Sequence, residues 1–201
     1  MTNNVFEQFD DDTIHTIAER VAQLLGSRPR VLIAIDGNCC AGKTTAAKRL
    51  GSALGASVFH MDDFFLQPHM RTPERMAQPG GNVDAERFLS SVLLPASRGE
   101  TARVRRYDCH ADMLLEESTV APGSVVIVEG TYSLHPMLAP YHDLKLFCRV
   151  SSARQVERVL ARNGEDGLKA FTERWIPLEN RYFDALDIEK SCDFIIDTTI
   201  V

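Results

Sequence analysis

The chain has 201 residues, of which 44% are hydrophobic and 25% are charged, and its formal net charge is −6. This length and composition predict one soluble globular domain, and the negative charge argues against nucleic acids or membrane surfaces as partners. No apolar run approaches the ~20 residues that cross a bilayer, and residues 1–7 carry no secretory signal, so we expect a cytoplasmic protein. The five cysteines are irregularly spaced, and we therefore expect reduced thiols and no zinc site.

The first predicted elements are an amphipathic helix over residues 12–25 and a strand over residues 31–35. Residues 1–30 are therefore expected to form an N-terminal helical extension. The strand reads V-L-I-A-I, and a continuous apolar, β-branched run of this kind is typical of a strand buried on both faces.

Residues 37–44, directly after this strand, fit the phosphate-loop pattern G-x-x-x-x-G-K-[ST] without a mismatch. A helix is predicted from residue 45 to about residue 54, so backbone N–H groups and a helix N-terminus would face an anion. In this pattern Lys43 reaches the β- and γ-phosphates and the Thr44 hydroxyl binds Mg²⁺. Cys40 is either a reactive thiol or, as we favour, a small loop residue. The predicted ATP-binding residues are Gly37, Asn38, Cys39, Cys40, Ala41, Gly42, Lys43, Thr44 and Thr45.

A short strand over residues 56–60 follows, and Asp62 and Asp63 come directly after it. One of them could accept a proton from a substrate hydroxyl while the other is structural; the alternative is an exposed acidic turn. The polar stretch from residue 67 to residue 82 is long for a connection, and long connections are often functional.

The remaining elements alternate between strands and helices. Asp84 is the expected N-cap of a helix that contains Phe88. Strands are predicted at residues 101–108, 124–128, 144–150 and 192–196. Helices are predicted at residues 153–162 and 170–186, and Pro177 is expected to interrupt the second of them. This alternation predicts an α/β fold with a mostly parallel sheet flanked by helices.

In such a sheet, ligands bind at the carboxyl ends of the strands, where Glu129 follows the apolar run 124–128. A carboxylate there could hold Mg²⁺ beside a triphosphate, or it could be a solvated strand end. Arg154, Arg158 and Arg162 recur every four residues and share one helix face, which suits either phosphate binding or a solvated surface.

The order of these motifs resembles the uridine kinase family, within the phosphoribulokinase and uridine kinase group of P-loop kinases. The matching segments are G-N-C-C-A-G-K-T-T at 37–45, H-M-D-D-F-F at 60–65, N-V-D at 82–84, R-Y-D at 106–108, V-V-I-V-E-G at 125–130, D-L-K-L at 143–146 and C-D-F-I-I at 192–196. The D-D-F-F segment also looks like nicotinamide riboside kinases.

This resemblance implies a three-layer P-loop fold, one kinase domain over residues 1–201, with a lid-like helical region at 153–186. It also implies that Asp62 is the general base, that Asp84 binds sugar hydroxyls, that Tyr107 and His110 contact the base, and that Arg158 reaches toward the substrate.

Two segments depart from the family pattern. Residues 162–167 are short and acidic where the family has a longer arginine-rich lid, and residues 173–182 have no counterpart. The aromatic residues of this region are expected to lie in the core rather than against a ligand: Phe171, Trp175 and Tyr182.

The expected function is transfer of the γ-phosphoryl group of ATP, with Mg²⁺, to a hydroxyl of a uridine- or cytidine-like nucleoside or a related small metabolite. The expected catalytic residues are Lys43, Asp62, Arg158 and Arg162, with Thr44 and Glu129 placing the metal. The alternative is a regulatory NTP-binding module with slow hydrolysis and no acceptor. The sequence leaves open GTP as donor, the acceptor and a homo-oligomer.

Overall fold

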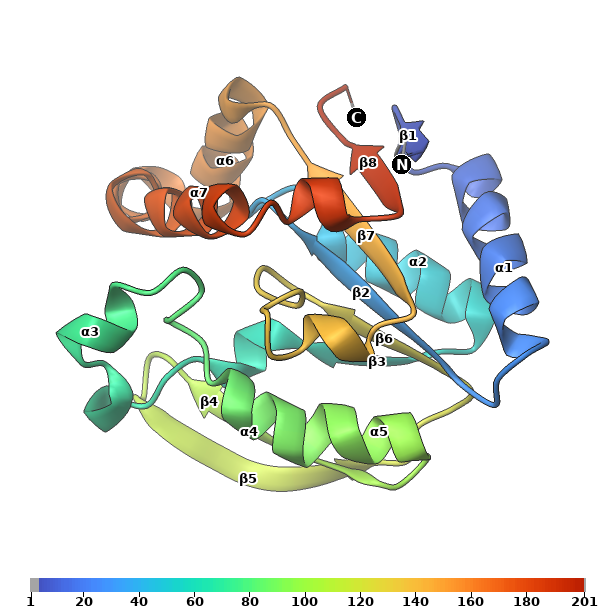
Figure 1. Ribbon diagram of the computed structural model, residues 1–201. Helices are drawn as coiled ribbons and strands as arrows, with labels where there is room; N and C mark the ends of the chain where they lie inside the picture. The colour runs from blue at the N-terminus through green and yellow to red at the C-terminus, as the bar shows by residue number, and fades with distance from the viewer. Residues whose placement is uncertain (1–3, 201) are drawn as a thin grey trace.

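A parallel β-sheet organises the structure, a computed structural model that describes residues 4–200. Within these residues six strands form one sheet in the order β1-β8-β7-β2-β6-β3, with every neighbouring pair parallel (Figure 1). The strands are β1 (Asn4–Phe6), β2 (Val31–Gly37), β3 (Ser57–His60), β6 (Val125–Glu129), β7 (Leu144–Arg149) and β8 (Phe194–Asp197). The predicted α/β class with a mostly parallel sheet is confirmed.

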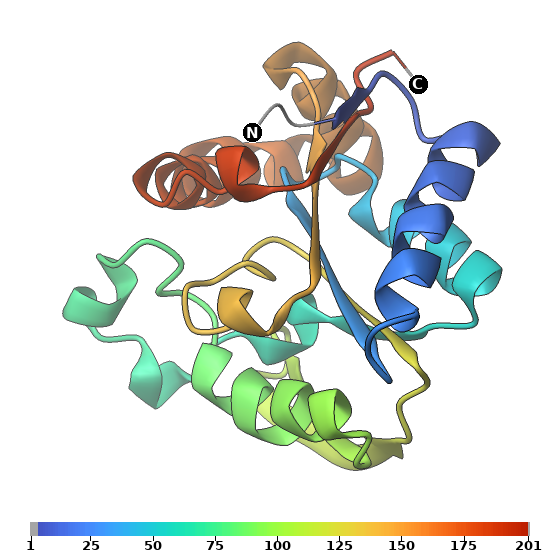
Figure 2. The same ribbon diagram turned by 45° about the vertical axis from the view of Figure 1, so that its right-hand side comes forward.

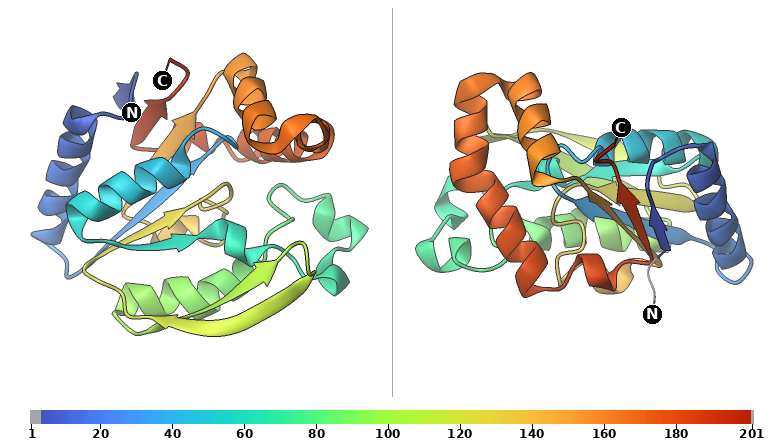
Figure 3. Two further views of the ribbon diagram at one scale, coloured as in Figure 1. Left: turned by 180° about the vertical axis from the view of Figure 1, so that it is seen from behind. Right: turned by 90° about the horizontal axis from the view of Figure 1, so that it is seen from above.

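The two neighbouring strands β2 and β6 are buried along their whole length, as their continuous apolar sequences predict. Helices cover both faces of the sheet (Figures 2 and 3). On one face, helices α1 (Asp11–Leu25) and α2 (Lys43–Leu54) contribute Ile17, Val21 and Leu50 to a core with β2 and β7.

The opposite face is covered by a helical stretch made of α4 (Ala85–Phe88), a π-helical turn (Leu89–Leu93) and α5 (Leu94–Arg98), and by α7 (Ile176–Ala185). Phe88, Val92 and Phe183 enter this second core together with Phe147 of β7. Short 3₁₀ turns at Met61–Phe64, Pro68–Met70, Ala139–Tyr141 and Glu189–Ser191, and the short helix α3 (Pro73–Met76), complete the connections.

An antiparallel ribbon of β4 (Ala102–Asp108) and β5 (Met113–Val120) lies outside the main sheet. The sequence predicts β4 but not β5. Most side chains of β5 are exposed, so it carries no alternation of apolar and polar residues that would reveal a strand.

The N-terminal segment differs from the helical extension expected over residues 1–30. Its described part, from residue 4, contributes the edge strand β1, which pairs with β8 in the register Asn4↔Phe194 and Phe6↔Ile196, before helix α1 begins. A three-residue, partly exposed strand is too short to show a period in the sequence.

Two long helices stand at the carboxyl edge of the sheet: α6 (Ser152–Ala170) and α7, joined by a π-helical turn (Phe171–Trp175). The expected interruption at Pro177 takes the form of the π-helical turn directly ahead of it, where a proline, which has no N–H, breaks the regular α-helical hydrogen bonding. Helix α6 runs past the expected end at residue 162, and Gly164 inside it has non-helical backbone angles. Among residues 4–200, no helix combines the length and apolarity needed to span a bilayer.

Candidate active site

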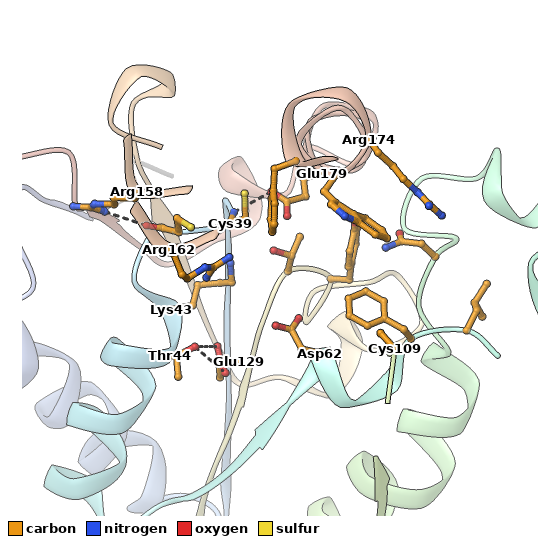
Figure 4. Close-up of a pocket in the computed structure, with 18 of the residues that line it drawn as sticks. Cys39, Lys43, Thr44, Asp62, Cys109, Glu129, Arg158, Arg162, Arg174 and Glu179 are labelled. Atoms are coloured by element: carbon orange, nitrogen blue, oxygen red, sulfur yellow. Dashed lines mark hydrogen bonds between the residues drawn. The ribbon is translucent and has the colours of Figure 1, made fainter. Parts of the chain in front are cut away.

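A cavity of about 800 Å³ opens at the carboxyl ends of β2, β3 and β6, beneath α6 and α7 (Figure 4). Because the carboxyl ends of parallel strands meet at one edge, residues far apart in the sequence share its wall. Eleven of the residues expected from the sequence to be functional line it: Cys39, Cys40, Gly42, Lys43, Thr44, Thr45, Asp62, His110, Glu129, Arg158 and Arg162.

The loop between β2 and α2 has the backbone of a phosphate-binding loop. Gly37 has φ +137°, and a Cβ there would lie 1.9 Å from the Cys148 carbonyl oxygen, so only glycine fits. Gly42, at φ +83°, is the N-cap of α2 and turns the helix N-terminus toward the cavity. The first N–H groups of a helix have no intrahelical partner, which suits an anion. Lys43 Nζ donates to the carbonyls of Gly37 (2.9 Å) and Asn38 (2.8 Å), so its ammonium group lies over the loop.

A hydroxyl and a carboxylate meet beside this loop. The Thr44 Oγ1 atom lies 3.3 Å from both carboxylate oxygens of the buried Glu129. Glu129 also accepts from His60 Nδ1, and this hydrogen bond raises the pKa of His60 above its usual value. Hydroxyl and carboxylate oxygens are ligands that Mg²⁺ prefers, so this pair fits the metal of a nucleotide complex.

Within residues 4–200, no group of three or more His, Cys, Asp or Glu side chains is placed to hold a metal ion. A magnesium ion at Thr44 and Glu129 would therefore take its remaining ligands from phosphates and water, as is usual for Mg²⁺ in kinases.

The Asp62 carboxylate faces the phosphate loop from the 3₁₀ turn that follows β3. In Figure 4, Asp62, Lys43 and Glu129 point into the same space. The surrounding protein raises the pKa of Asp62 by desolvation, Lys43 opposes this, and the negative charge of Glu129 adds to it. The neighbouring Asp63 turns away and accepts from Arg106 Nε at 2.7 Å. The structure thus places Asp62, and not Asp63, at the cavity.

The arginines of α6 separate into different roles. Arg158 donates to the Cys40 carbonyl (3.1 Å) and to the Thr198 carbonyl (2.6 Å), which ties α6 to the phosphate loop. Arg162 lies 5.6 Å from the centre of the Phe171 ring and lines the cavity. Arg154 pairs with Glu157 at 2.8 Å and does not line the cavity.

Two of the residues expected to bind the substrate are engaged elsewhere. Asp84 is buried as the N-cap of α4 and accepts from the Arg87 backbone N–H and Nε, both at 3.0 Å. The Tyr107 hydroxyl contacts Asp112 and accepts from Arg71 at 2.7 Å. Neither residue lines the cavity, whereas His110 and Arg71 do.

Asp36, the last residue but one of β2, is a site residue that the sequence motifs do not predict. Its carboxylate is fully buried and accepts four hydrogen bonds, from the backbone N–H groups of Gly37, Tyr132 and Leu134 and from the Tyr182 hydroxyl (2.8 Å). Burial raises the pKa of Asp36. Asp36 therefore joins the phosphate loop, the loop after β6 and helix α7. Its signal in the sequence is a lone carboxylate at the end of an apolar strand.

Two polar side chains from the helices α6 and α7 also hold the loop. Glu179 Oε2 accepts from the Cys39 backbone N–H at 2.9 Å, and Gln155 Nε2 donates to the Cys39 carbonyl at 3.2 Å. Both side chains are buried, and desolvation raises the pKa of Glu179. Their only sequence signal is a polar residue on the inward face of a helix.

Aromatic side chains form part of the cavity wall. Phe65 and Trp175 lie 6.3 Å apart between ring centres, and both line the cavity with Phe171. The expectation of core positions is correct for the fully buried Tyr182 and wrong for Phe171 and Trp175, which are only half-buried. They come from the π-helical turn, which directs their side chains toward the cavity.

Family models and curated proteins give no match to this chain. Solved structures do match. A possible uridine kinase from Bacillus stearothermophilus is 21% identical with a TM-score of 0.65, and the match covers 90% of this chain and 100% of that chain. A candidate P-loop containing kinase with a circular permutation, from Saccharomyces cerevisiae, is 14% identical with a TM-score of 0.63 over 94% and 99% of the two chains.

Phosphoribulokinase from Rhodobacter spheroides is 12% identical with a TM-score of 0.58 over 85% of this chain and 71% of that chain. At these identities the likeness concerns the fold. The chain has the three-layer α/β fold of the P-loop kinases that its motifs resemble.

Proposed function

We propose that this protein is an ATP-dependent small-molecule kinase that transfers the γ-phosphoryl group to a hydroxyl group. One observation carries the proposal: the phosphate loop with Lys43, the Thr44–Glu129 pair and Asp62 line the same cavity. A volume of about 800 Å³ lies within the range of small-molecule sites.

The residues would divide the work of phosphoryl transfer, which depends on positioning and charge stabilisation. The N–H groups at the start of α2 and the Lys43 ammonium group would bind the phosphates of ATP, whereas the N–H groups of Gly37 and Cys39 donate to Asp36 and Glu179. Arg162, and Arg158 if it leaves the Cys40 carbonyl, stabilise the charge that develops during transfer. Thr44 and Glu129 hold Mg²⁺, which, when bound, neutralises phosphate charge.

Asp62 would orient the acceptor hydroxyl and take its proton. A carboxylate with a raised pKa is a better proton acceptor than an ordinary one, provided that it is ionised at the working pH. Its position across the cavity from Lys43 leaves the space between them for the reacting groups.

The acceptor would lie against the aromatic residues of the cavity wall. Phe65 and Trp175 offer flat surfaces to a planar ring, and His110 offers a hydrogen bond, which supports a nucleoside (uridine- or cytidine-like) or a related metabolite. The hydrogen bonds that occupy Asp84 and Tyr107 argue that these two residues act indirectly, unless their partners rearrange.

We further propose that residues 1–201 form one kinase domain, that residues 153–186 act as its lid, and that it works in the cytoplasm, where its five free cysteines stay reduced. The hydrogen bonds of Gln155 and Glu179 to Cys39 give the lid a direct contact to the phosphate loop.

A screen of acceptors with Mg-ATP, measured by ADP release, tests the function. Nucleosides, nicotinamide riboside, pantothenate and sugars would be compared, with Asp62→Asn as the control variant. Acceptor-dependent ADP release that is lost in Asp62→Asn supports the kinase. Slow ADP release that no acceptor changes would instead identify a regulatory NTP-binding module.

A further inference from the structure

Two buried polar side chains of the cavity have hydrogen-bonding groups that the protein leaves unused. Asn82 is 7% exposed and Tyr132 is 3% exposed, and both residues line the cavity. Within residues 4–200, the Asn82 Nδ2 group has no hydrogen-bond partner, and the Tyr132 hydroxyl makes no hydrogen bond either. Leaving a buried donor without a partner is costly, so a ligand oxygen that accepts from it recovers that cost on binding.

The backbone on both sides of Asn82 is held in place. Arg75 donates to the carbonyls of Gly81 (3.1 Å) and Val83 (3.0 Å). The Asn82 carbonyl accepts from the Leu66 N–H at 3.3 Å, which fixes this segment beside the chain that follows the proposed general base. The protein therefore holds Asn82 at a fixed place in the cavity wall and still leaves its amide donor without a partner.

Tyr132 is held in a strained backbone conformation. Its φ is +79°, an outlier for a bulky residue, and strain of this kind persists only where the surroundings impose it. The Tyr132 N–H donates to the Asp36 carboxylate at 3.2 Å, and its ring packs edge-on against Tyr182, with 4.8 Å between ring centres. These contacts hold the backbone and the ring, but they leave the hydroxyl without a partner.

The two unused groups are neighbours. Desolvation, and after it the charge of Glu179, raises the pKa of Tyr132, whereas the Asn82 amide opposes this rise, so the amide is close to the hydroxyl. No hydrogen bond of normal geometry joins the two side chains. A ligand oxygen placed between them can accept from both the amide and the hydroxyl.

The charge of the cavity favours an anionic oxygen in this position. Five Lys or Arg side chains and three Asp or Glu side chains line the cavity, although the chain as a whole has a net charge of −6. In the proposed function Lys43, Arg158 and Arg162 serve the triphosphate. Arg71 is paired with Asp112 at 2.9 Å. The fifth cation therefore decides whether the acceptor meets a positive charge.

Arg174, in the π-helical turn, is this fifth cation. It stacks on the Trp175 ring at 4.6 Å, and no carboxylate pairs with it in the part of the chain that the structure describes, residues 4–200. In the view of Figure 4, Arg174 and Lys43 lie on opposite sides of the cavity with Asp62 between them. The guanidinium fork of an arginine in this place can bind two oxygens of a carboxylate or a phosphate.

We propose that Asn82, Tyr132 and Arg174 form the subsite that selects the phosphoryl acceptor, and that they bind an anionic oxygen group, a carboxylate or a phosphate, carried by the acceptor alcohol. The inference rests on the proposed kinase function and narrows its acceptor. The hydroxyl group of the acceptor faces Asp62, and its anionic group lies on the far side from the phosphate loop. Among the acceptors proposed above, this favours an anionic metabolite over an uncharged nucleoside.

Matched pairs of compounds that differ in one charged group test the subsite. The pairs are pantothenate and panthenol, glycerate and glycerol, and orotidine and uridine; glycerol 3-phosphate, added to the second pair, distinguishes a phosphate from a carboxylate. The whole protein is titrated with each compound by calorimetry and then assayed with Mg-ATP by ADP release. We expect the anionic member of at least one pair to bind at least tenfold more tightly than its neutral partner and to have the higher kcat/KM.

Variants assign the preference to these residues. Tyr132→Phe removes only the unused hydroxyl, and Asn82→Ala removes the unused amide. Each should raise the KM of the best acceptor about five- to tenfold, change kcat less than about twofold and leave the Kd of Mg-ATP unchanged. Arg174→Gln should remove the preference for the anionic member. Arg98→Gln is the matched control and should keep the preference, because Arg98 is an exposed arginine outside the cavity.

The unmodified protein can overturn the inference by itself, whether or not the variants fold. Neutral members that bind as tightly as their anionic partners in every pair, or no binding by any compound, would do so. If anionic compounds bind, the variants weaken their binding and no acceptor changes ADP release, the subsite stands and the kinase proposal fails. If a neutral compound is phosphorylated and none of the three cavity variants changes its KM by more than twofold, the kinase proposal stands and the subsite is wrong.

Discussion

The buried carboxylate of Asp36 should contribute more to stability than any surface carboxylate of the chain, and Asp36→Asn tests this. One carboxylate oxygen accepts from the Gly37 and Tyr132 N–H groups, and the other accepts from the Leu134 N–H group (2.9 Å) and the Tyr182 hydroxyl. An asparagine can keep its oxygen on one side only. On the other side its NH₂ group meets the Leu134 N–H, and this buried donor loses its partner.

We expect Asp36→Asn to lower the free energy of unfolding by about 2–4 kcal/mol, because the cost of one unpaired buried N–H group and of the lost hydrogen bonds exceeds the relief of the desolvation that raises the pKa of Asp36. Tyr182→Phe removes a single bond to the same carboxylate and should cost about 1.5–3 kcal/mol. Urea unfolding followed by circular dichroism measures both. Because the two residues touch, the double variant should cost less than the sum of the single variants.

The matched control is Asp187→Asn, because this aspartate is 65% exposed and asparagine tolerates its φ of +48°. It should change stability by less than about 0.5 kcal/mol. If Asp36→Asn falls within the same limit, the four hydrogen bonds do not hold the loop as described.

Three further predictions follow from the site. Gly37→Ala should destabilise the fold by about 3 kcal/mol or more, because its Cβ would lie 1.9 Å from a backbone oxygen. Gly55→Ala is the control: Gly55 has φ +60° with open space around it, so this substitution should cost about 1 kcal/mol in the same urea assay. Equal costs for the two substitutions would contradict the close approach at Gly37. Glu129→Gln should weaken Mg-ATP binding about tenfold in calorimetry, whereas ATP binding in EDTA should be unchanged or tighter, because a negative charge is removed. Thr44→Ala should weaken Mg-ATP binding by a similar factor and leave ATP binding in EDTA unchanged. A loss of equal size without metal would refute the metal role. The raised pKa of Asp62 should place the acidic limb of the kcat/KM profile above pH 3.8, the usual pKa of an aspartate. Because the folded state disfavours the ionised form of Asp62, Asp62→Asn should increase the free energy of unfolding at neutral pH, and this gain should disappear as the pH falls through the raised pKa. A gain in stability that persists below pH 3.8 would contradict this prediction.

Local patterns in the sequence were sufficient for the phosphate loop and the strands next to it. The glycines, Lys43 and Thr44 of the loop have a fixed spacing, and the continuous apolar sequences of β2 and β6 predict that both strands are buried. The pairing of Thr44 with Glu129 could also be anticipated, because parallel neighbours end at the same edge of the sheet.

Contacts made by α6 and α7 could not be predicted in this way. Glu179 and Cys39 are 140 residues apart, and their hydrogen bond depends on where a helix returns to the sheet. Trp175 has the same sequence signal whether it faces a core or a cavity. From the sequence, the Asp84 carboxylate could cap a helix or bind substrate hydroxyl groups. Only the structure shows that this carboxylate accepts a hydrogen bond from Arg87 Nε.

The central claim is that ATP bound at Lys43 meets an acceptor hydroxyl activated by Asp62. The most direct measurement compares the wild type with Asp62→Asn, using the best acceptor, for both the Kd of Mg-ATP by calorimetry and the turnover rate. We predict a Kd that is unchanged or lower, since a negative charge near the triphosphate is removed, and a rate reduced by about 10²–10⁴-fold. Equal turnover in the two proteins, or the absence of any binding heat with Mg-ATP, would contradict it.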